Sequence, residues 1–376
     1  MGTPRKLKVG ILTSSRADYG IYLPLLRKLN NDPFFEMEVI AFGTHLLEKY
    51  GRTVEFIYQD GFKVAEVGNT MSEGDSPKHI VQAMSKTMQA FSLFFEKSEY
   101  HLLFALGDRY EMFAAVAASA PFNLKIAHIH GGETTLGAID NAFRHSITSF
   151  SCLHFVTTEI YKKKVVEITG CHDNIYNVGA LSIDNLINME LYSVPDFKAK
   201  YGIDLSKPTI LITVQPETVA FEKNEQHIKE IIGALKQLTG YQLVITMPNA
   251  DTSGLIIRNY LQKFGENRPC TWLIESFGVK GYLSAMKHCS FLLGNTSSGF
   301  VEAAFFPKTV INLGDRQKGR ILTNNIIPVQ ITTGNILNAV IQAEQLPITT
   351  NCNIYGDGNS AEKITEIVKQ KFLTYD

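Results

Sequence analysis

Several ionisable residues come directly after apolar runs of the kind that form buried strands. Asp108 follows a run that ends at Leu106, His130 and Glu133 close the next such run, and Asp140 comes a short loop later. Carboxylates and imidazoles exchange protons near neutral pH, and residues that follow parallel strands meet at one edge of a sheet. The pattern predicts general acid/base chemistry, with Asp108, Glu133, Asp140 and His130 as the proton-transferring groups.

Other roles are open for the same residues. On a strand, His128 and His130 would point to one face and could bind a metal ion with a nearby carboxylate. No further His or Cys stands at a matching spacing, so we expect no metal. Asp108 and Asp140 could instead cap helices, and Asp140 could form a surface ion pair with Arg144 one helical turn further on.

A second set of residues has the composition of an anion-binding site. The segment 295–299 is rich in hydroxyl groups and precedes a helix-like stretch, 300–306, whose first turn carries Glu302. Small residues before a helix allow backbone N–H groups to face a phosphate. The loop 314–320 follows another apolar run and supplies countercharge through its basic residues. These two loops predict a diphosphate site.

Three further loops follow predicted strands and would complete the rim of a ligand site. The first contains Arg16, which adds positive charge, and Asp18, which could equally cap a helix. The other two contain Gln215 and Asn249. None of these loops has the glycine spacing of a dinucleotide fingerprint, so a nicotinamide or flavin cofactor is not expected.

The elements that would position these residues alternate along the chain between strands and helices. Short apolar and β-branched runs predict strands at 8–14, 36–42, 63–67, 101–106, 125–130, 154–157, 175–178, 209–214, 242–246, 271–275, 290–293, 309–313 and 329–331. Helical periodicity predicts helices at 20–30, 79–97, 109–119, 140–150 and 360–372.

Apolar strands that alternate with helices predict parallel sheets buried on both faces. Two such series predict an α/β fold with two Rossmann-like, doubly wound domains. We expect an N-terminal domain at 1–190 with the acid/base residues and a C-terminal domain at 191–358 with the anion-binding loops. The remaining helix, 359–376, is expected to pack back on the N-terminal domain.

The composition excludes several classes of protein. The chain of 376 residues has 36 Lys and Arg against 37 Asp and Glu, a net charge of −1, which argues against nucleic-acid binding. No apolar run reaches the roughly 18 residues that a membrane span needs. Five widely spaced cysteines without a CxxC pair predict buried free thiols and neither a disulfide framework nor a zinc site. We therefore expect a cytoplasmic protein without membrane partners.

Taken together, these motifs resemble those of the hydrolysing UDP-N-acetylglucosamine 2-epimerases, which open sialic-acid biosynthesis. The resemblance extends over nearly the whole chain. Its motifs are Ser15-Arg16-Ala17-Asp18-Tyr19, Gly107-Asp108-Arg109, Gly131-Gly132-Glu133, the segments 295–299 and 314–320, and Ile354-Tyr355-Gly356-Asp357-Gly358-Asn359. Each match alone is weak, but six in order are specific.

The resemblance implies two Rossmann-like domains that face a cleft, as in glycosyltransferase-B enzymes, and a homo-oligomer that needs no cofactor or metal. It implies that UDP-GlcNAc and water are converted to N-acetylmannosamine and UDP. The proton on carbon 2 is removed, UDP leaves carbon 1, and the glycal intermediate is hydrated. Asp108 and Asp140 match the family's catalytic positions directly.

The resemblance and the loop positions together give the residues expected to bind the UDP-sugar. They are Arg16, Asp18, Arg109, Arg144, His145, Gln215, Asn249, Asn295, Ser297, Ser298, Gly299, Glu302, Arg316 and Arg320.

Two residues depart from the pattern of many family members. His130 stands where they have Glu, and Gln215 stands where they have His. The first departure leaves His130 and Glu133 as alternatives for the third acid/base group, with Glu133 slightly favoured. Both also fit a subgroup that uses a 2,4-diacetamido-trideoxy (bacillosamine-type) sugar on the legionaminic-acid route. A glycosyltransferase of the same architecture, a non-hydrolysing epimerase, a metal-dependent hydrolase and a nucleotide-sugar sensor remain alternatives.

Overall fold

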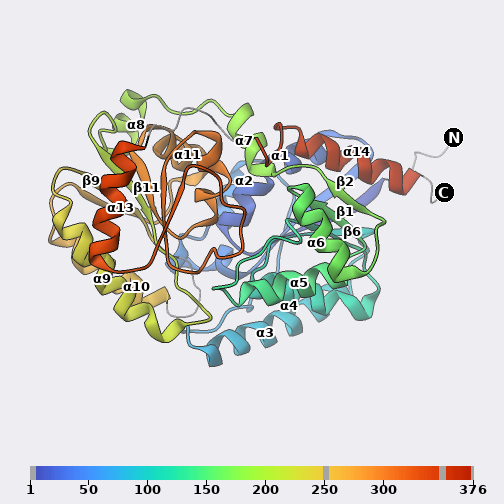
Figure 1. The fold of residues 1–376 in the computed structure, drawn as a ribbon. Coiled ribbons are helices and arrows are strands. Elements are labelled where there is room, and N and C mark those ends of the chain that lie inside the picture. Colours follow the sequence, from blue (N-terminus) through green and yellow to red (C-terminus); the bar gives the residue numbers. More distant parts are fainter. Residues whose placement is uncertain (1–5, 249–253, 347–352, 374–376) are drawn as a thin grey trace. The chain divides into compact units, whose positions relative to one another are not determined.

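A computed structural model describes residues 6–248, 254–346 and 353–373, and its chain forms two compact units (Figure 1). Unit 1 comprises Met1–Glu133, Asp140–Asn188 and Ile354–Asp376. Unit 2 comprises Thr134–Ile139 and Met189–Asn353. The chain therefore leaves unit 1 for six residues within a single loop, which nothing in the sequence indicated.

Each unit contains one parallel sheet. The strands of unit 1 are β1 (Leu7–Thr13), β2 (Phe35–Ala41), β3 (Val64–Glu66), β4 (Leu102–Leu106), β5 (Ile126–Ile129), β6 (Leu153–Val156) and β7 (Ile175–Asn177). Those of unit 2 are β8 (Thr209–Thr213), β9 (Gln242–Thr246), β10 (Thr271–Ile274), β11 (Phe291–Gly294), β12 (Val310–Leu313) and β13 (Ile326–Val329). The predicted two-sheet α/β fold is confirmed. The last predicted strand, 329–331, is misplaced, because β13 takes the Ile-Ile-Pro-Val run that precedes it.

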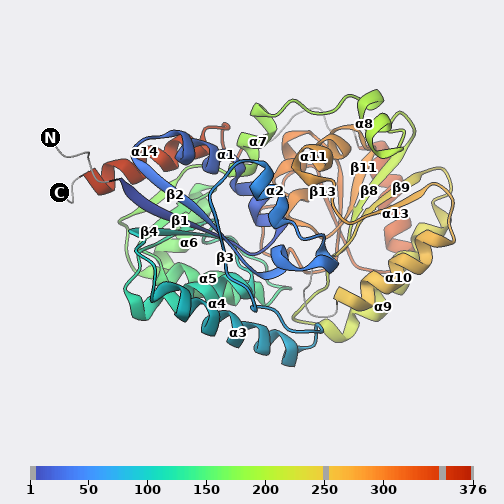
Figure 2. The same cartoon turned by 180° about the vertical axis from the view of Figure 1, so that it is seen from behind.

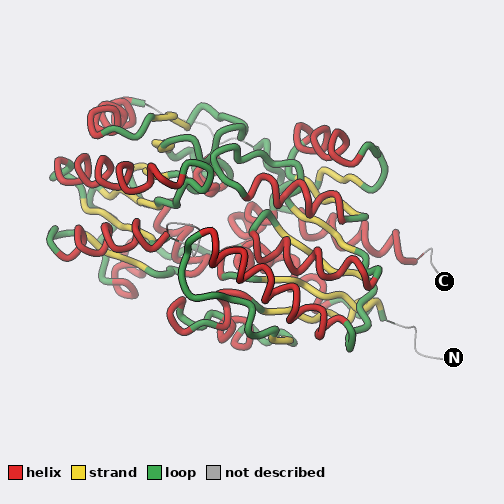
Figure 3. The backbone as a smooth tube through the Cα atoms, turned by 90° about the horizontal axis from the view of Figure 1, so that it is seen from below, coloured by secondary structure: helices red, strands yellow, loops and turns green. Residues whose placement is uncertain are grey.

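Helices flank both sheets, as the red and yellow segments of Figure 3 show. In unit 1 they are α1 (Arg16–Asn31), α2 (Val54–Gln59), α3 (Pro77–Phe95), α4 (Tyr110–Ser119), α5 (Asp140–Phe150), α6 (Glu159–Thr169), α7 (Leu181–Asn188) and α14 (Ser360–Leu373). In unit 2 they are α8 (Val194–Tyr201), α9 (Asn224–Gln237), α10 (Gly254–Glu266), α11 (Gly278–His288), α12 (Glu302–Phe305) and α13 (Thr333–Gln345). Short 3-10 turns at Gly43–Leu46, Glu48–Tyr50, Ala120–Phe122, Phe221–Lys223 and Ser297–Gly299 complete the described elements.

Burial explains why the strand sequences are continuously apolar. Every residue of β4 (LLFAL) and of β8 (TILIT) is buried. In unit 1, α3, α4, α5 and α6 cover one face of the sheet, and α1, α7 and α14 cover the other (Figures 1 and 2). In unit 2, α9, α10 and α13 pack on one face and α8 and α11 on the other, which gives two separate apolar clusters. Helices on both faces leave no polar side for the strands.

The strand order places one topological switch point in each sheet. The order is β3-β2-β1-β4-β5-β6-β7 in unit 1 and β10-β9-β8-β11-β12-β13 in unit 2. Chain connections run in opposite directions from β1 and β4, and likewise from β8 and β11. In open α/β sheets, ligands bind beyond the carboxyl ends of the strands at such points. The loops after β4, β8 and β11 contain Asp108, Gln215 and Asn295, and Arg16 is the first residue of the helix that follows β1.

One predicted helix is shorter than expected. The stretch 300–306 was expected to be helical, but the structure has a 3-10 turn at Ser297–Gly299 and only the four residues of α12. Pro307 ends this segment, because proline lacks an N–H and restricts the residue before it. A single turn carries little macrodipole, so anion binding here depends on backbone N–H groups, hydroxyls and cations.

The described cysteines are free thiols as predicted, but the prediction that they are buried is wrong for three of them. Of the four cysteines among the described residues, only Cys289 is buried, while Cys152, Cys171 and Cys270 are exposed free thiols. These three lie at element ends, where the backbone turns at the surface; Cys270 has a left-handed φ of 54° before β10. Cys352 lies outside the described residues. Within the described chain, no helix is long and apolar enough to span a bilayer.

The C-terminal helix α14 packs against α1 and α7 in unit 1 (Figure 1). Asp184 on α7, 2% exposed, accepts hydrogen bonds from the backbone N–H groups of Ser360 at 3.0 Å and Ala361 at 2.7 Å. These N–H groups have no partner within the helix, so a carboxylate distant in sequence caps it. Burial raises the pKa of Asp184, and the two N–H donors oppose that rise.

We predict that Asp184→Ala lowers the free energy of unfolding by about 1–3 kcal/mol, because two buried N–H groups lose their acceptor. Asp184→Asn keeps an acceptor oxygen and should lose less. Denaturant unfolding measures both variants against Asp173→Ala, a change at an exposed loop residue. Equal losses for Ala and Asn at position 184 would contradict the capping role.

Candidate active site

A buried arginine joins the residues that follow β4 and β5. Arg144 lies on α5 and is 2% exposed. One of its Nη groups pairs with Oδ2 of Asp108, and the other donates to the carbonyl oxygen of His130 at 2.8 Å and lies 3.8 Å from Oε2 of Glu133. The surface ion pair considered for Arg144 is therefore wrong, because its side chain points inward. Three acid/base candidates gather around one guanidinium.

Asp108 does not cap the helix that follows it. The N-cap position of α4 is Arg109, whose side chain makes no capping hydrogen bond. The Asp108 carboxylate instead pairs with Arg144, with its side chain 23% exposed. Asp108 is thus held by a buried cation while part of it remains accessible. Asp140 is the first residue of α5 and is 8% exposed.

His130 has a backbone conformation that is rare outside glycine. Strand β5 ends at Ile129, and His130 turns into the left-handed region with φ 67°. Such conformations are costly for non-glycine residues and often occur at functional sites. Because of this turn, His130 leaves the strand, so the expectation that His128 and His130 share a strand face fails.

Glu133 lies behind His130. Its Oε1 is 3.3 Å from Nδ1 of His130 and accepts a hydrogen bond from Thr157 Oγ1 at 3.2 Å. Glu133 is 1% exposed, whereas His130 is 8% exposed. The carboxylate is therefore placed to orient the imidazole ring.

His128 is fully buried and holds the turn that carries Asp108. Its Nε2 donates to the Gly107 carbonyl oxygen at 2.8 Å, and its Nδ1 lies 3.0 Å from Thr148 Oγ1. Burial lowers the pKa of His128 to about 3, so the ring is neutral at physiological pH. Both ring nitrogens are engaged within the protein, which argues against metal ligation by His128. Among the described residues, no cluster of three or more His, Cys, Asp or Glu could hold a metal ion.

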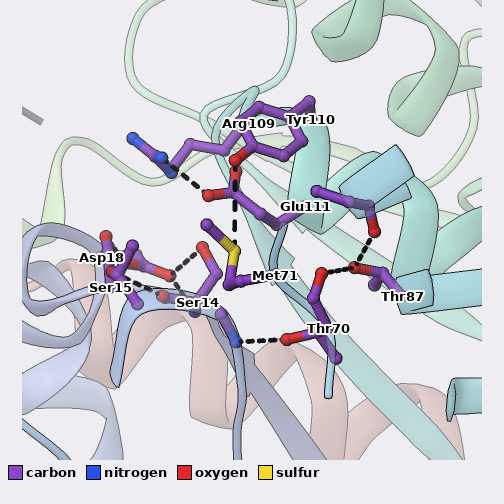
Figure 4. Close-up of polar contacts among 12 residues, drawn as sticks. Ser14, Ser15, Asp18, Thr70, Met71, Thr87, Arg109, Tyr110 and Glu111 are labelled. Carbon is purple, nitrogen blue, oxygen red and sulfur yellow. Dashed lines mark hydrogen bonds and ion pairs between the residues drawn. The ribbon is translucent and has the colours of Figure 1, made fainter. Parts of the chain in front are cut away.

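The turn after β1 is organised by Asp18 (Figure 4). The Asp18 carboxylate, 4% exposed, accepts a hydrogen bond from the Ser14 backbone N–H at 2.6 Å and another from the Ser15 hydroxyl. Thr13 Oγ1 is 3.3 Å from the same carboxylate and 3.0 Å from Nε2 of His45, which is also buried. The structure places Asp18 as the residue that fixes this turn, next to the partly exposed Arg16.

A second charged pair lies at the start of α4 (Figure 4). Arg109 Nη2 donates to Oε1 of Glu111 at 2.8 Å, and Glu111 is fully buried. The hydroxyl of Tyr110 lies 4.0 Å from the sulfur of Met71, in the segment that follows β3. Arg109 therefore carries a buried counterion, which orients its guanidinium at the edge of the sheet.

In unit 2, the loops after β8 and β11 are locked together by one side chain. Asn295, 2% exposed, accepts from the backbone N–H of Gln215 at 2.7 Å and donates to the Gln215 carbonyl oxygen at 2.8 Å. Both hydrogen-bonding groups of the Asn295 amide are thus used on the backbone of Gln215. Its role is to hold this switch-point loop.

The cationic loop 314–320 is fixed at several points. Oε1 of Glu217, a buried residue, accepts from the Asp315 N–H at 2.7 Å, and Arg316 Nε donates to the Pro216 carbonyl at 3.2 Å. Gly314 has φ 67°, and a Cβ there would lie 2.3 Å from Oε1 of Glu217, so only glycine fits. The loop is therefore held by contacts within unit 2.

The hydroxyl-rich loop has one inward and one outward serine. The Ser298 hydroxyl lies 2.7 Å from the Tyr282 hydroxyl and 3.2 Å from Thr296 Oγ1, whereas Ser297 is exposed. Burial raises the pKa of Tyr282 to about 12, so it remains a neutral hydrogen-bonding phenol. Ser298 is held by the protein, and Ser297 faces solvent at the same loop. Gly299 is buried, and Glu302 is partly buried at the start of α12.

His145, Arg320 and Asn249 were also expected to bind the UDP-sugar. His145 is half-buried on α5, where burial, followed by the charge of Arg144, lowers its pKa. Arg320 is 8% exposed and near the end of its loop. Asn249 lies outside the described residues.

The sequence did not predict the residues that hold other residues of the candidate site in place by hydrogen bonds. His128 was considered only as a metal ligand, and Tyr282, Glu217 and Gln317 were not singled out. For Gln317 a signal existed, because it stands within the cationic loop 314–320. Nothing in the sequence indicates that Tyr282 reaches Ser298 or that Glu217 reaches Asp315.

Residues 27–369 match the family model described as UDP-N-acetylglucosamine 2-epimerase. This match spans most of the chain. The chain belongs to that family. The resemblance inferred from the six motifs is therefore confirmed.

Three of the relatives that the chain resembles are 30% or more identical to it. The chain is 35% identical over 327 residues to a Campylobacter jejuni protein named GDP/UDP-N,N'-diacetylbacillosamine 2-epimerase (hydrolyzing), covering 87% of this chain and 85% of that one. It is 33% identical to the Escherichia coli polysialic acid biosynthesis protein P7, covering 89% and 85%. It is 30% identical to a Legionella pneumophila UDP-N,N'-diacetylbacillosamine 2-epimerase (hydrolyzing), covering 96% and 95%.

The fold is also that of solved epimerases. A Methanocaldococcus jannaschii UDP-GlcNAc 2-epimerase in complex with UDP-GlcNAc and UDP superimposes with a TM-score of 0.81 at 17% identity, covering 96% of this chain and 99% of that one. A plant glycosyltransferase, Glycyrrhiza uralensis UGT73P12, aligns with a TM-score of 0.61 at 11% identity, covering 97% and 96%. The glycosyltransferase-B-like class expected from the sequence is confirmed.

We predict that unit 1 loses stability in mild acid. The folded pKa of His128 is about 3 and that of His154 about 4, both lowered chiefly by burial. Below about pH 6.5 the unfolded chain takes up these protons first, so the free energy of unfolding falls as pH falls.

Each of these two histidines should lower the free energy of unfolding by about 1.4 kcal/mol when the pH falls from 7.5 to 5.5. Denaturant unfolding at the two pH values measures the loss, and His128→Gln should reduce it. The matched change at the exposed His172 should leave the pH dependence as in the parent. A parent protein equally stable at both pH values would contradict the prediction.

Proposed function

We propose that this protein is a hydrolysing 2-epimerase that converts a UDP-linked 2-acetamido sugar and water to the free 2-epimeric sugar and UDP. The observation that carries the proposal is the group of Asp108, His130 and Glu133 around the buried Arg144. Proton transfer to and from carbon requires several acid/base groups in fixed positions. Family membership supports the reaction class.

Unit 2 would bind the UDP group. Its loops 295–299 and 314–320 offer backbone N–H groups, the exposed hydroxyl of Ser297 and the guanidinium groups of Arg316 and Arg320. These groups stabilise the negative charge that develops on UDP as its bond to carbon 1 breaks. Glu302 would bind ribose hydroxyls.

Unit 1 would carry out the proton transfers. A base removes the proton on carbon 2 while UDP leaves carbon 1, and an acid later delivers a proton to the opposite face of carbon 2 as water adds to carbon 1. Asp108, held by Arg144 and partly exposed, suits the role of one of these proton-transferring groups. Asp140, at the start of α5, would be its partner.

The geometry favours His130 over Glu133 as the third group that touches substrate. Glu133 is the more deeply buried and contacts Nδ1 of His130 at 3.3 Å. A carboxylate on one imidazole nitrogen fixes the tautomer and stabilises the imidazolium form. This reverses the slight preference for Glu133 drawn from the sequence and makes Glu133 a positioning residue.

Two substrates are candidates for this reaction. Two of the relatives carry diacetylbacillosamine and the word hydrolyzing in their names, so we propose a UDP-2,4-diacetamido-trideoxy sugar first. UDP-GlcNAc, which gives N-acetylmannosamine on a sialic-acid route, is the second candidate, supported by the polysialic acid relative and the solved UDP-GlcNAc complex.

We predict that proton NMR of the protein with each UDP-sugar in heavy water shows a free sugar carrying deuterium at carbon 2, together with UDP. The better substrate has the higher kcat/KM. An epimer still linked to UDP would show the non-hydrolysing reaction instead. Retention of both UDP-sugars in the absence of an acceptor would favour a glycosyltransferase.

We predict that Asp108→Asn and Asp140→Asn each reduce kcat at least about a hundredfold while UDP affinity is retained, because each removes a proton-transferring group. Steady-state kinetics and calorimetry with UDP measure the two effects, and Asp173→Asn on an exposed loop is the control. Normal turnover in either variant would show that the residue has only a structural role.

Steady-state kinetics also distinguish the role of His130 from that of Glu133. We expect His130→Ala to lose at least about a hundredfold in kcat. Glu133→Gln should retain more activity and shift the pH–rate profile to lower pH, because the imidazolium loses a stabilising charge. An inactive Glu133→Gln beside an active His130→Ala would reverse the assignment.

A further inference from the structure

The imidazole of His128 contacts both segments that carry the ion pair between Asp108 and Arg144. Its Nε2 lies 2.8 Å from the carbonyl oxygen of Gly107, the residue directly before Asp108. Its Nδ1 lies 3.0 Å from Oγ1 of Thr148, which stands one helical turn after Arg144 on α5. One ring therefore joins the backbone that leads into the carboxylate to the helix that carries the guanidinium.

The two hydrogen bonds of this ring have a fixed direction. A carbonyl oxygen can only accept, so Nε2 of His128 carries the hydrogen and donates to Gly107. In the neutral ring Nδ1 is then an acceptor, and the Thr148 hydroxyl donates to it. Burial keeps the ring neutral, because it lowers the pKa of His128 to about 3. As a donor to Nδ1, Thr148 stabilises the tautomer that holds the Gly107 carbonyl.

Both backbone groups of Gly107 are bound to β5. Its N–H donates to the Ile129 carbonyl oxygen at 3.0 Å, and its carbonyl accepts from His128. Gly107 has φ 79°, and a Cβ there would meet no atom within 4 Å, so side-chain packing does not hold this position. The Gly107 carbonyl shares a planar peptide with the Asp108 nitrogen, and its hydrogen bond therefore fixes the orientation in which Asp108 begins.

The turn that carries His130 packs on the same two side chains. His128 and Thr148 are both 0% exposed. A Cβ on Gly131, the residue after His130, would lie 3.1 Å from Nδ1 of His128 and 3.2 Å from Oγ1 of Thr148. The His130 turn, the Asp108 turn and α5 thus all contact this one pair of side chains.

We propose that His128 and Thr148 are positioning residues for proton transfer, whose hydrogen-bonded pair fixes the Asp108 carboxylate and the Arg144 guanidinium relative to each other. This rests on the proposed function, in which Asp108 transfers a proton. Neither side chain touches substrate, because both are fully buried, and both act through Asp108. Small displacements matter here, since a misplacement of about 1 Å can cost a hundredfold in rate.

The test is a double-mutant cycle of Thr148→Val and Asp108→Asn, read by kcat, KM and calorimetry with UDP. Thr148→Val keeps the shape of the side chain and removes the hydroxyl. We expect it to lower kcat roughly tenfold, the scale of one hydrogen bond, and to leave UDP affinity unchanged, because unit 2 would bind UDP. In the Asp108→Asn background its further effect should be less than about twofold. Thr148→Ser, which keeps the hydroxyl, should retain most of kcat.

NMR of protein with isotope-labelled histidine tests the hydrogen-bond directions. We expect the His128 ring as the Nε2–H tautomer at neutral pH, and His128→Gln assigns its signals by their loss. An Nδ1–H tautomer or a charged ring would overturn the assignment, because neither fits a donor to Gly107 together with an acceptor for Thr148.

The kinetic outcomes bear on different claims. Normal turnover in Asp108→Asn would show that the proposed function of Asp108 is wrong. If Asp108→Asn is impaired but Thr148→Val is not, the positioning role is wrong. Equal losses in Thr148→Ser and Thr148→Val, or an undiminished loss in the Asp108→Asn background, would show that Thr148 only supports the fold.

Thr365→Val on α14 is the matched control. Thr365 is also a buried helical threonine of unit 1, and its hydroxyl donates to the Ala361 carbonyl at 2.8 Å. Its replacement should leave kcat as in the parent. Thermal unfolding checks that each variant is folded at the assay temperature.

Discussion

The buried guanidinium of Arg144 is the constraint on which the acid/base site of unit 1 depends. A cation that is almost removed from water must be compensated by nearby anions, since an unpaired buried charge costs several kcal/mol. Its partners come from loops after two neighbouring strands, with Asp108 after β4 and the His130 carbonyl and Glu133 after β5. Only parallel pairing of β4 with β5 brings these loops to the same edge. The charge on Arg144 therefore links the sheet topology to the positions of the reactive groups.

In unit 2 the loops of the candidate anion site are held in part by another kind of side chain, the uncharged amide. Asn295 clamps Gln215, and Gln317 holds Arg320. In unit 1 charged groups hold one another, whereas in unit 2 neutral amides hold the two loops. Both arrangements sit at the switch point of a parallel sheet, where loops leave in opposite directions.

The sequence predicts the sheets well because a strand buried on both faces has no polar alternation, and β4 and β8 show this pattern. It predicts poorly wherever tertiary contacts override local preference. His130 lies in the left-handed region although it is not glycine, and its carbonyl oxygen accepts a hydrogen bond from Arg144 on α5. The helical pattern after Gly299 similarly yields to Pro307. Residue types thus indicate which groups do the chemistry, but partners distant in sequence decide which of them face the substrate.

The acid/base residues of unit 1 flank a short segment of the chain that belongs to unit 2. The carboxylates Glu133 and Asp140 stand at the two ends of Thr134–Ile139, and this segment belongs to unit 2. There the Leu136 N–H donates to the Lys318 carbonyl at 2.9 Å, and a Cβ on Gly137 would lie 2.3 Å from the Asp315 carbonyl oxygen. So close an approach permits only glycine, and it seats six residues of backbone directly on the cationic loop. The two carboxylates of unit 1 are therefore joined by a segment whose own backbone contacts lie on the cationic loop of unit 2.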